Sequence, residues 1–192
     1  MKKTPQCHIV AGPNGAGKTT FALDYLMHEI NCRAFINADM IAQGLSPLAP
    51  QSVQVKAGKL FLEELKRHLK QKESFCFETT LSGSSYLQKI NQWRKDGWHV
   101  ILHYLWIPNA QFSALRVQER VAQGGHDIPH KAILRRYDKS LRNLFNYLPI
   151  CNEVMCYDNS DVNHPLIFTM ARGKIEVINA PLYKSIQQKT CP

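Results

Sequence analysis

Short apolar runs alternate with longer segments of helical pattern along most of the chain. Apolar residues recur at helical spacing near residues 50–72 and 134–148, and residues 19–29 have helical composition. The end of the chain has the pattern of a hairpin that turns at Arg172 and Gly173. The apolar runs typical of β-strands are residues 7–11, 33–36, 74–80, 98–107 and 153–157.

The order of these segments predicts the fold. Strands separated by helices pair in parallel through right-handed crossovers, so we expect an α/β fold with a doubly wound, mainly parallel five-stranded sheet, followed by a hairpin near residues 166–179. The length of 192 residues requires no second domain, and we expect residues 1–192 to form one. Ligands bind outside the carboxyl ends of parallel strands, so Gly12, Asp39 and Glu78 should lie along one rim.

The segment GPNGAGKT, residues 12–19, matches the phosphate-loop pattern G-x-x-x-x-G-K-[ST] completely and follows the first predicted strand. The backbone N–H groups of such a loop surround phosphate oxygens, while Lys18 contacts the β- and γ-phosphates of ATP and the Thr19 hydroxyl ligates Mg²⁺. The alternative is a glycine-rich turn that binds nothing. The predicted ATP contacts are Gly12, Pro13, Asn14, Gly15, Ala16, Gly17, Lys18, Thr19 and Thr20, with Thr19 also the metal ligand.

Other features of the sequence narrow the class of nucleotide-binding protein. No apolar strand ends in the aspartate of a typical Walker B segment, and no guanine-reading signature is visible. The chain is also too short for a motor-ATPase core with its lid domain. A small kinase remains, which requires an acceptor site beside the second and third strands and a basic lid over the γ-phosphate.

The formal charge of +9 favours anionic partners such as nucleotides, sugar phosphates or nucleic acid. The six cysteines form no C-x-x-C pair and no apolar run is long enough to cross a bilayer, so we expect a cytoplasmic protein with reduced thiols and no membrane contact. Many cations lie in one basic block, although any of them alone fits a solvated helix face. The block contains Arg116, Arg120, Lys131, Arg135, Arg136, Lys139 and Arg142.

Asp39 has two interpretations. It follows the second strand in FINADMIAQG, residues 35–44, beside the phosphate loop, where a base would take the proton of an acceptor hydroxyl. It also precedes Met40 and other helix-forming residues, as a helix N-cap does. We predict the base and keep the cap as the alternative.

Glu78 and Thr80 leave the third strand in the segment FETTLSG. A carboxylate among apolar neighbours requires a hydrogen-bonding ligand or a cation, so we predict that both residues contact the acceptor, with a structural polar network as the alternative. After the fifth strand, Tyr157, Asp158 and Asn159 fit either the wall of an adenine site or a simple turn.

Residues 116–136 have the composition of a mobile lid. Gly124 and Gly125 separate Arg120 from His126, for which a backbone-bonded loop histidine is the simpler interpretation than a role in closure. Closing the lid would exclude water and place a guanidinium against the transferred phosphoryl group. The predicted catalytic residues are Lys18, Asp39, Arg120, Arg135 and Arg136.

Taken together, AGPNGAGKTT, FINADMIAQG, FETTLSG, RVQERVAQGGHDIP and ILRRYDKSLRNL resemble the zeta-toxin family of P-loop kinases, in its short bacterial form, over residues 7–160. Characterised members of that family phosphorylate the 3′-hydroxyl of UDP-N-acetylglucosamine with ATP and Mg²⁺. The resemblance implies that Asp39 is the base and Arg120 a transition-state arginine. It also implies that Lys18 and Thr19 are the phosphate and metal contacts, and that Glu78 and Thr80 contact the sugar nucleotide.

Two segments depart from the family pattern. The family's E-G-T is Glu78-Thr79-Thr80 here, and Gly125-His126-Asp127 stands where larger members carry a second lid arginine. That second role therefore falls to Arg116, Arg135 or Arg136, or to none of them.

We predict an ATP- and Mg²⁺-dependent kinase that phosphorylates a hydroxyl of a small-molecule acceptor. By resemblance the acceptor is UDP-N-acetylglucosamine, with another sugar or a nucleoside as alternatives. The positive charge motivates a second hypothesis, a polynucleotide kinase, although we expect a small molecule rather than nucleic acid. A third is a catalytically inactive nucleotide-dependent binding module with an antitoxin protein as its partner, against which the intact Asp39 and Arg120 argue.

Overall fold

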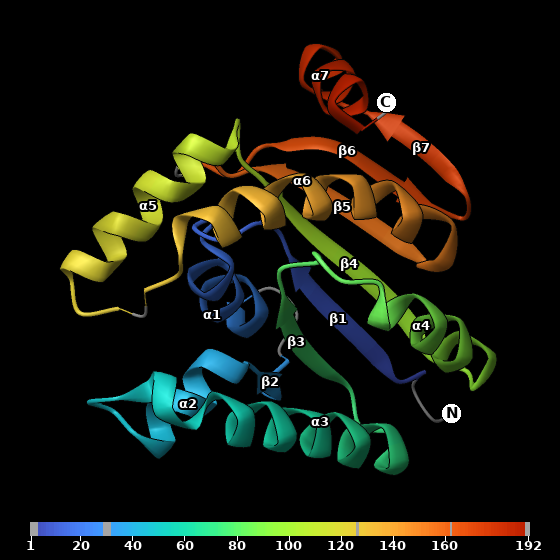
Figure 1. Ribbon diagram of the computed structural model, residues 1–192. Coiled ribbons are helices and arrows are strands. Elements are labelled where there is room, and N and C mark those ends of the chain that lie inside the picture. The colour runs from blue at the N-terminus through green and yellow to red at the C-terminus, as the bar shows by residue number, and fades with distance from the viewer. Residues whose placement is uncertain (1–3, 29–31, 126, 162, 191–192) are drawn as a thin grey trace.

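In the computed structural model, residues 4–28, 32–125, 127–161 and 163–190 are described. His126, named above for lid closure, lies outside them. Within the described residues seven strands form one sheet in the order β2-β3-β1-β4-β5-β6-β7 (Figure 1). The strands are β1 (Gln6–Ala11), β2 (Phe35–Ile36), β3 (Phe75–Thr79), β4 (His99–Trp106), β5 (Glu153–Asp158), β6 (Leu166–Ala171) and β7 (Lys174–Val177).

The first five strands pair in parallel, as the alternation of strand and helix patterns predicts. The predicted hairpin is confirmed, but it does not stand apart from the sheet. Strand β6 pairs antiparallel with β5, and β7 pairs with β6, so the sheet extends from five strands to seven. Its turn residues, Arg172 and Gly173, have φ angles of 52° and 74°, which suit a tight two-residue hairpin turn.

The helical segments predicted at residues 19–29, 50–72 and 134–148 are confirmed as α1 (Lys18–His28), α3 (Gln54–Gln71) and α6 (His130–Tyr147), with differences at their ends. The segment 50–72 begins as a short 3₁₀ turn, η1 (Pro50–Val53), before α3 starts. The sequence pattern does not predict α4 (Ser85–Lys95), α5 (Ala110–Ala122) or the C-terminal α7 (Ala180–Thr190), and in α7 Ile186 alone is buried among the residues of the helix. The helices are α1 (Lys18–His28), α2 (Ala38–Leu45), α3 (Gln54–Gln71), α4 (Ser85–Lys95), α5 (Ala110–Ala122), α6 (His130–Tyr147) and α7 (Ala180–Thr190), and a second 3₁₀ turn, η2 (Leu148–Ile150), follows α6.

Helices cover both faces of the sheet, which makes it doubly wound. Successive residues of a strand point to opposite faces, and β4 demonstrates this. The ring of His103 lies 6.1 Å from that of Phe21 on α1, whereas the hydroxyl of the next residue, Tyr104, lies 3.1 Å from the Ser140 hydroxyl on α6. Both faces of the central strands are therefore buried.

The main core contains all three tryptophans, Trp93, Trp98 and Trp106, which are buried. The five described cysteines are free thiols and are also buried. None of the helices in the described residues combines the length and apolar character that crossing a bilayer requires.

Candidate active site

The phosphate loop joins β1 to α1 at the carboxyl edge of the sheet, and its backbone is tightly packed against β4. Gly12 has a φ of +149°, and a Cβ placed on it would lie 2.5 Å from the Leu105 carbonyl oxygen. A side chain at this position would displace the loop, so the first glycine of the pattern is required by close backbone approach. The loop is also tied to α5, because the Ser113 hydroxyl donates a hydrogen bond to the Asn14 carbonyl at 2.5 Å.

Lys18, the first residue of α1, is 6% exposed and points back into the loop. Its Nζ donates a hydrogen bond to the Pro13 carbonyl at 2.9 Å and lies 3.6 Å from Glu78 Oε1. Burial lowers the pKa of Lys18, while the charges of Glu78 and Asp39 act in the opposite direction. The ammonium group is thus held among oxygen atoms at the position where the pattern predicts phosphate contacts.

Glu78, near the end of β3, lies in a polar network with the phosphate loop. Its Oε2 accepts hydrogen bonds at 2.7 Å from both the Thr19 hydroxyl and Asn37 Nδ2. In the described residues Glu78 therefore contacts the loop and its lysine, which is the structural network named as the alternative. A contact between Glu78 and the acceptor stays a prediction.

The same network has the donor set that Mg²⁺ prefers. The Thr19 hydroxyl and the Glu78 carboxylate are adjacent oxygen ligands beside the phosphate loop. Among the described residues, His, Cys, Asp and Glu side chains nowhere gather in a group of three or more that could hold a metal ion. A magnesium ion carried by one or two protein oxygens together with nucleotide phosphates fits this arrangement.

Asp39 is not the N-cap of α2. That position belongs to Asn37, whose Oδ1 accepts hydrogen bonds from the backbone N–H groups of Asp39 at 2.8 Å and of Met40 at 3.1 Å. The Asp39 side chain is exposed, and within the described residues its carboxylate makes neither a hydrogen bond nor a salt bridge. The cap interpretation is therefore wrong, and the carboxylate is available to a ligand.

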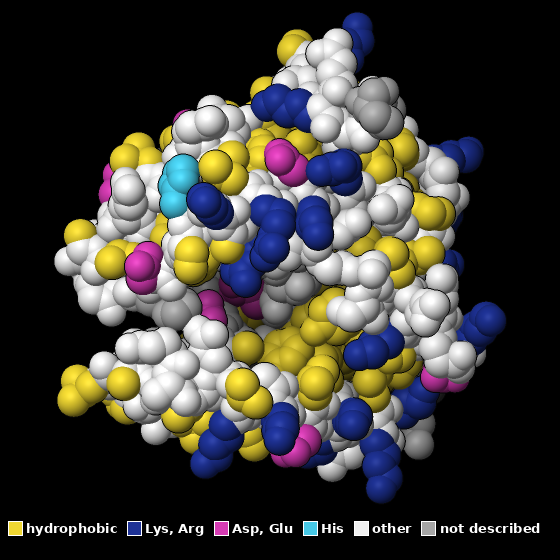
Figure 2. All heavy atoms as spheres, in the orientation of Figure 1, with side chains coloured by type: hydrophobic (Ala, Val, Ile, Leu, Met, Phe, Trp, Pro, Cys, Tyr) yellow, Lys and Arg dark blue, Asp and Glu magenta, His cyan; other side chains and the backbone are white. Residues whose placement is uncertain are grey.

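Asp39 lies between two pockets of one cleft. One pocket, of about 230 Å³, is shared with Thr19, Arg120 and the lid glycines. The other, of about 500 Å³, is polar and within the size range of ligand sites. Figure 2 shows the cleft opening between the part that carries α2 and the part that carries α5, with Lys and Arg side chains above it. The larger pocket is lined by Asn14, Asp39, Thr80, Ser82, Asp127 and Arg136, together with neighbouring residues.

Thr80 lines the larger pocket, and its hydroxyl is 2.8 Å from that of Ser82. A contact between Thr80 and the acceptor stays a prediction. Two residues that sequence reasoning did not single out, Gln51 and Gln54, contribute amides to the same wall. They come from the start of α3 and the turn before it, where the sequence contains no motif.

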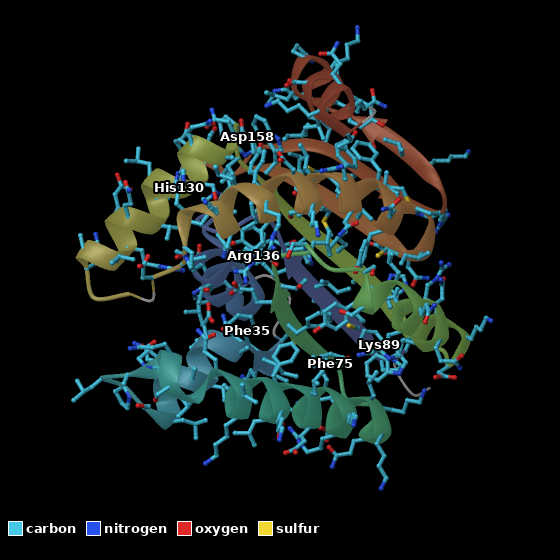
Figure 3. The ribbon with its side chains drawn as sticks, viewed as in Figure 1. Phe35, Phe75, Lys89, His130, Arg136 and Asp158 are labelled. Carbon is cyan, nitrogen blue, oxygen red and sulfur yellow. The ribbon has the colours of Figure 1, made fainter. Side chains whose placement is uncertain are left out.

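The arginines of the basic block separate into different sites. Arg116 and Arg120, one helical turn apart on α5, line a pocket of about 340 Å³ with Lys18 and Thr19. Arg136, on α6, lines the larger pocket instead and lies on the cleft side of its helix (Figure 3). Arg135, one residue earlier, is exposed on the outside of α6. The structure thus gathers Arg116 and Arg120 near the phosphate loop, but not Arg135 or Arg136.

Arg116 also borders a fourth pocket, of about 470 Å³, on the other side of the loop with Phe21 and Asn159. Its guanidinium donates hydrogen bonds to the carbonyls of Asn159 at 2.7 Å and Ser160 at 3.2 Å. Asn159 Nδ2 in turn donates to the Ala16 carbonyl at 2.5 Å. Of the three residues proposed for the adenine side, Asn159 lines this pocket, Tyr157 packs beneath α1, and Asp158 accepts hydrogen bonds in a turn.

The segment that the sequence predicts as a lid is packed around a small core of its own. Ala114 and Val117 of α5 pack against Ile128 and Ile133, separately from the main core. This cluster joins α5 to the beginning of α6, so the two cation-bearing segments are held by their own contacts around the glycine turn.

Comparisons with known proteins agree with this geometry. A sequence model of the family described as Zeta toxin matches residues 1–163. A protein of Haemophilus influenzae, described as an "Uncharacterized protein", is 30% identical over 126 residues, which is 66% of this chain and 88% of its own length.

Solved structures show the same fold at low identity. The AvrRxo1-ORF1:AvrRxo1-ORF2 complex with sulphate ions matches with a TM-score of 0.78 and 16% identity, over 98% of this chain and 65% of that chain. The form with ATP matches with a TM-score of 0.75, 15% identity and the same coverage. The PezAT toxin-antitoxin system of Streptococcus pneumoniae matches with a TM-score of 0.63 and 15% identity, over 98% and 86% of the two chains.

The chain spans 65% of the length of the AvrRxo1 chain that it matches, and these similarities establish the fold. The family match, in contrast, covers most of the sequence and includes the phosphate loop, Asp39, Glu78 and the lid. This chain belongs to the zeta-toxin family of P-loop kinases.

Proposed function

We propose that this kinase transfers the γ-phosphate of ATP to a hydroxyl group of a small-molecule acceptor held in the larger pocket. The observation that carries the proposal is the position of Asp39, whose unbonded carboxylate lies between that pocket and the one bordered by Thr19 and Arg120. A base at the boundary between donor and acceptor is what phosphoryl transfer to an alcohol requires.

In this proposal the acceptor oxygen attacks the γ-phosphorus while its proton passes to a carboxylate oxygen of Asp39. The bond to the β-phosphate oxygen breaks and ADP leaves. Lys18 and the loop N–H groups hold the phosphates, and Arg120 stabilises the charge of the transferred phosphoryl group. Mg²⁺, held by Thr19 with Glu78 beside it, would neutralise charge on the β- and γ-phosphates.

The adenine of ATP is assigned to the pocket beyond Arg116. The guanidinium of Arg116 lies 4.5 Å from the Phe112 ring and is fixed by two backbone carbonyls, so it offers a rigid planar surface beside Asn159. A planar cation of this kind favours stacking with a purine.

Family membership favours UDP-N-acetylglucosamine as the acceptor. Amide, hydroxyl and carboxylate groups predominate on the wall of the larger pocket, which suits the many donors and acceptors of a sugar. Another sugar or a nucleoside would use the same groups.

The test is ATP turnover by the purified protein with Mg²⁺ and UDP-N-acetylglucosamine, with products identified by mass. We expect a UDP-sugar heavier by one phosphoryl group, absent with Lys18→Ala and reduced about 100-fold or more with Asp39→Asn. Near-normal transfer by Asp39→Asn would remove the base assignment. ATP binding without this product would exclude this acceptor and direct a screen towards other sugars and nucleosides.

A polynucleotide kinase is the second candidate, favoured by the exposed cations Lys131, Arg135, Lys139 and Arg142 on the outside of α6. Oligonucleotide binding that falls steeply with salt but persists at physiological salt would support it. Binding lost at physiological salt would exclude it.

The partner is proposed to be an antitoxin protein, since a chain from the PezAT toxin-antitoxin system has the same fold as this protein. Growth arrest on expression of the wild-type chain, absent with Lys18→Ala, would show that such an inhibitor is needed. Unaffected growth would argue against a toxic role. A protein that binds ATP but turns over no acceptor would correspond to the inactive binding module.

A further inference from the structure

The guanidinium groups of the cleft fall on two sides of Asp39. Arg116 and Arg120 border the pocket that contains Lys18 and Thr19, where ATP phosphates belong. Arg136 borders the larger pocket with Thr80 and Ser82, and it is absent from the wall of the phosphate pocket. Helix α6 therefore contributes a cation to the acceptor side of the cleft.

Arg136 is half-buried, and in the described residues its side chain makes neither a hydrogen bond nor a salt bridge. A partly desolvated guanidinium that no carboxylate pairs with directly favours an anionic ligand.

We propose that Arg136 binds the anionic group of the acceptor and so determines the specificity of the larger pocket for anionic over neutral acceptors. This inference rests on the proposed function of the cleft, and it assigns Arg136 to substrate recognition rather than to the transition state.

The chemistry of the pocket defines the orientation of such an acceptor. Asp39 repels an anion and accepts the proton of a hydroxyl, whereas the planar fork of Arg136 matches two oxygens of a phosphate or carboxylate. The second carboxylate, Asp127, is exposed and also repels an anion. The hydroxyl end therefore faces Asp39 and the anionic end faces α6.

The proposal is tested by comparing a neutral acceptor with its anionic counterparts. N-acetylglucosamine, N-acetylglucosamine 1-phosphate and UDP-N-acetylglucosamine are assayed with wild type, Arg136→Gln and Arg136→Lys. We expect Arg136→Gln to raise KM for the anionic acceptors about 10- to 100-fold with little change in kcat, and to leave KM for the neutral sugar unchanged. Arg136→Lys should recover part of the loss, because it keeps the charge but not the fork.

Lys139→Gln is the matched control, since Lys139 is an exposed cation one turn further along α6. It should leave all three KM values unchanged. A loss of kcat without a change in KM for Arg136→Gln would overturn the proposal and make Arg136 a transition-state arginine. Equal effects on neutral and anionic acceptors would also overturn it.

A binding measurement separates this proposal from the proposed function. Calorimetry with N-acetylglucosamine 1-phosphate is done with the phosphate loop saturated by Mg²⁺ and a non-hydrolysable ATP analogue. Binding of the sugar phosphate that is weakened by Arg136→Gln but not by Lys139→Gln supports the anion site. If no product forms in the turnover assay, that result counts against the kinase assignment and not against the anion site. If product forms with UDP-N-acetylglucosamine and Arg136→Gln binds the sugar phosphate as well as wild type does, the anion site is overturned and the proposed kinase function stands. Failure of wild type to bind the sugar phosphate would also overturn it.

Discussion

The Thr19 hydroxyl donates a hydrogen bond of 2.7 Å to Glu78 Oε2 and so links the start of α1 to the end of β3. Strands β1 and β3 are neighbours, with Val10 opposite Glu78 in the parallel register, so this contact follows from the sheet order. The sheet thus places an acidic oxygen beside the threonine of the phosphate loop, although 59 residues separate the two in sequence.

Replacing Glu78 by glutamine tests whether this carboxylate serves the metal or the acceptor. Because Glu78 contacts Thr19 and Lys18, we expect Glu78→Gln to raise the Mg²⁺ concentration required for turnover about tenfold or more. The KM for the acceptor should stay nearly constant. The measurement is turnover titrated with Mg²⁺ and then with acceptor. An increase in acceptor KM with an unchanged Mg²⁺ requirement would instead support the sequence-based prediction of an acceptor contact.

Asn37 should matter for both stability and activity, because it caps α2 and also donates a hydrogen bond to Glu78. Asn37→Ala should lower the free energy of unfolding by about 1 kcal/mol and reduce kcat about tenfold or more, since Asp39 and Glu78 both lose a positioning contact. Urea unfolding and steady-state kinetics measure the two effects.

Asn109→Ala is the matched control for that change. Asn109 caps α5 in the same way, with its Oδ1 accepting a hydrogen bond of 2.8 Å from the Phe112 N–H. We expect a similar loss of stability with a much smaller change in kcat. Equal kinetic losses in both variants would show that reduced stability, rather than misplacement of Asp39, explains the effect.

Local patterns predicted much of this architecture. The phosphate loop was recognisable because all of its requirements lie within eight consecutive residues, and β4 because its apolar run ends at a proline. The C-terminal α7 was not marked, since its single described buried residue, Ile186, gives no helical periodicity.

The functional roles of neighbouring residues were harder to separate. Asn37 and Asp39 are both good N-caps, and only the observed end of β2 decides that Asn37 caps α2. Arg135 and Arg136 are equivalent in the sequence, but adjacent helical residues differ by about 100° in direction, so the packing of α6 determines which one reaches the cleft. Such choices depend on tertiary contacts that no short motif encodes.

Gly125 is expected to be essential for the position of Arg120. A Cβ at Gly125 would lie 2.6 Å from Arg120 Cγ and 2.8 Å from its carbonyl oxygen, so Gly125→Ala must displace the end of α5. We expect kcat to fall about tenfold or more, because the guanidinium leaves the phosphate pocket. Steady-state kinetics checks this, with thermal unfolding to measure the accompanying change in stability.

Gly58→Ala provides the contrasting case. Gly58 lies inside α3, and a Cβ there would contact nothing within 4 Å. This variant should gain about 0.5–1 kcal/mol in free energy of unfolding, because alanine favours helix, and should keep its kcat. Normal activity of Gly125→Ala would show that Arg120 adapts to the added methyl group and that the glycine is not needed for the arginine's position.

Acid should destabilise the protein through two buried histidines. His8 Nδ1 and His103 Nε2 lie 3.1 Å apart beneath α1, and burial lowers the pKa of His8 to about 4 and that of His103 to about 3. Because the unfolded chain binds protons near the ordinary pKa of 6.5, it takes up more protons than the folded chain between that pH and the folded values. The contribution of this pair to the free energy of unfolding is therefore fully present above about pH 6.5, and it is lost as the pH decreases towards 4.

For His8 alone the expected loss is about 2 kcal/mol between neutral pH and about pH 5, where exposed carboxylates remain ionised. Urea unfolding at the two pH values measures it. In His103→Phe the partner nitrogen and its proton uptake are both removed, so the slope of stability against pH should become smaller even though the variant is less stable at neutral pH. His28→Phe serves as the control, because it removes an exposed histidine instead of a buried one. A wild-type stability that stays constant down to about pH 5 would mean that the buried pair accepts a proton without opening the structure.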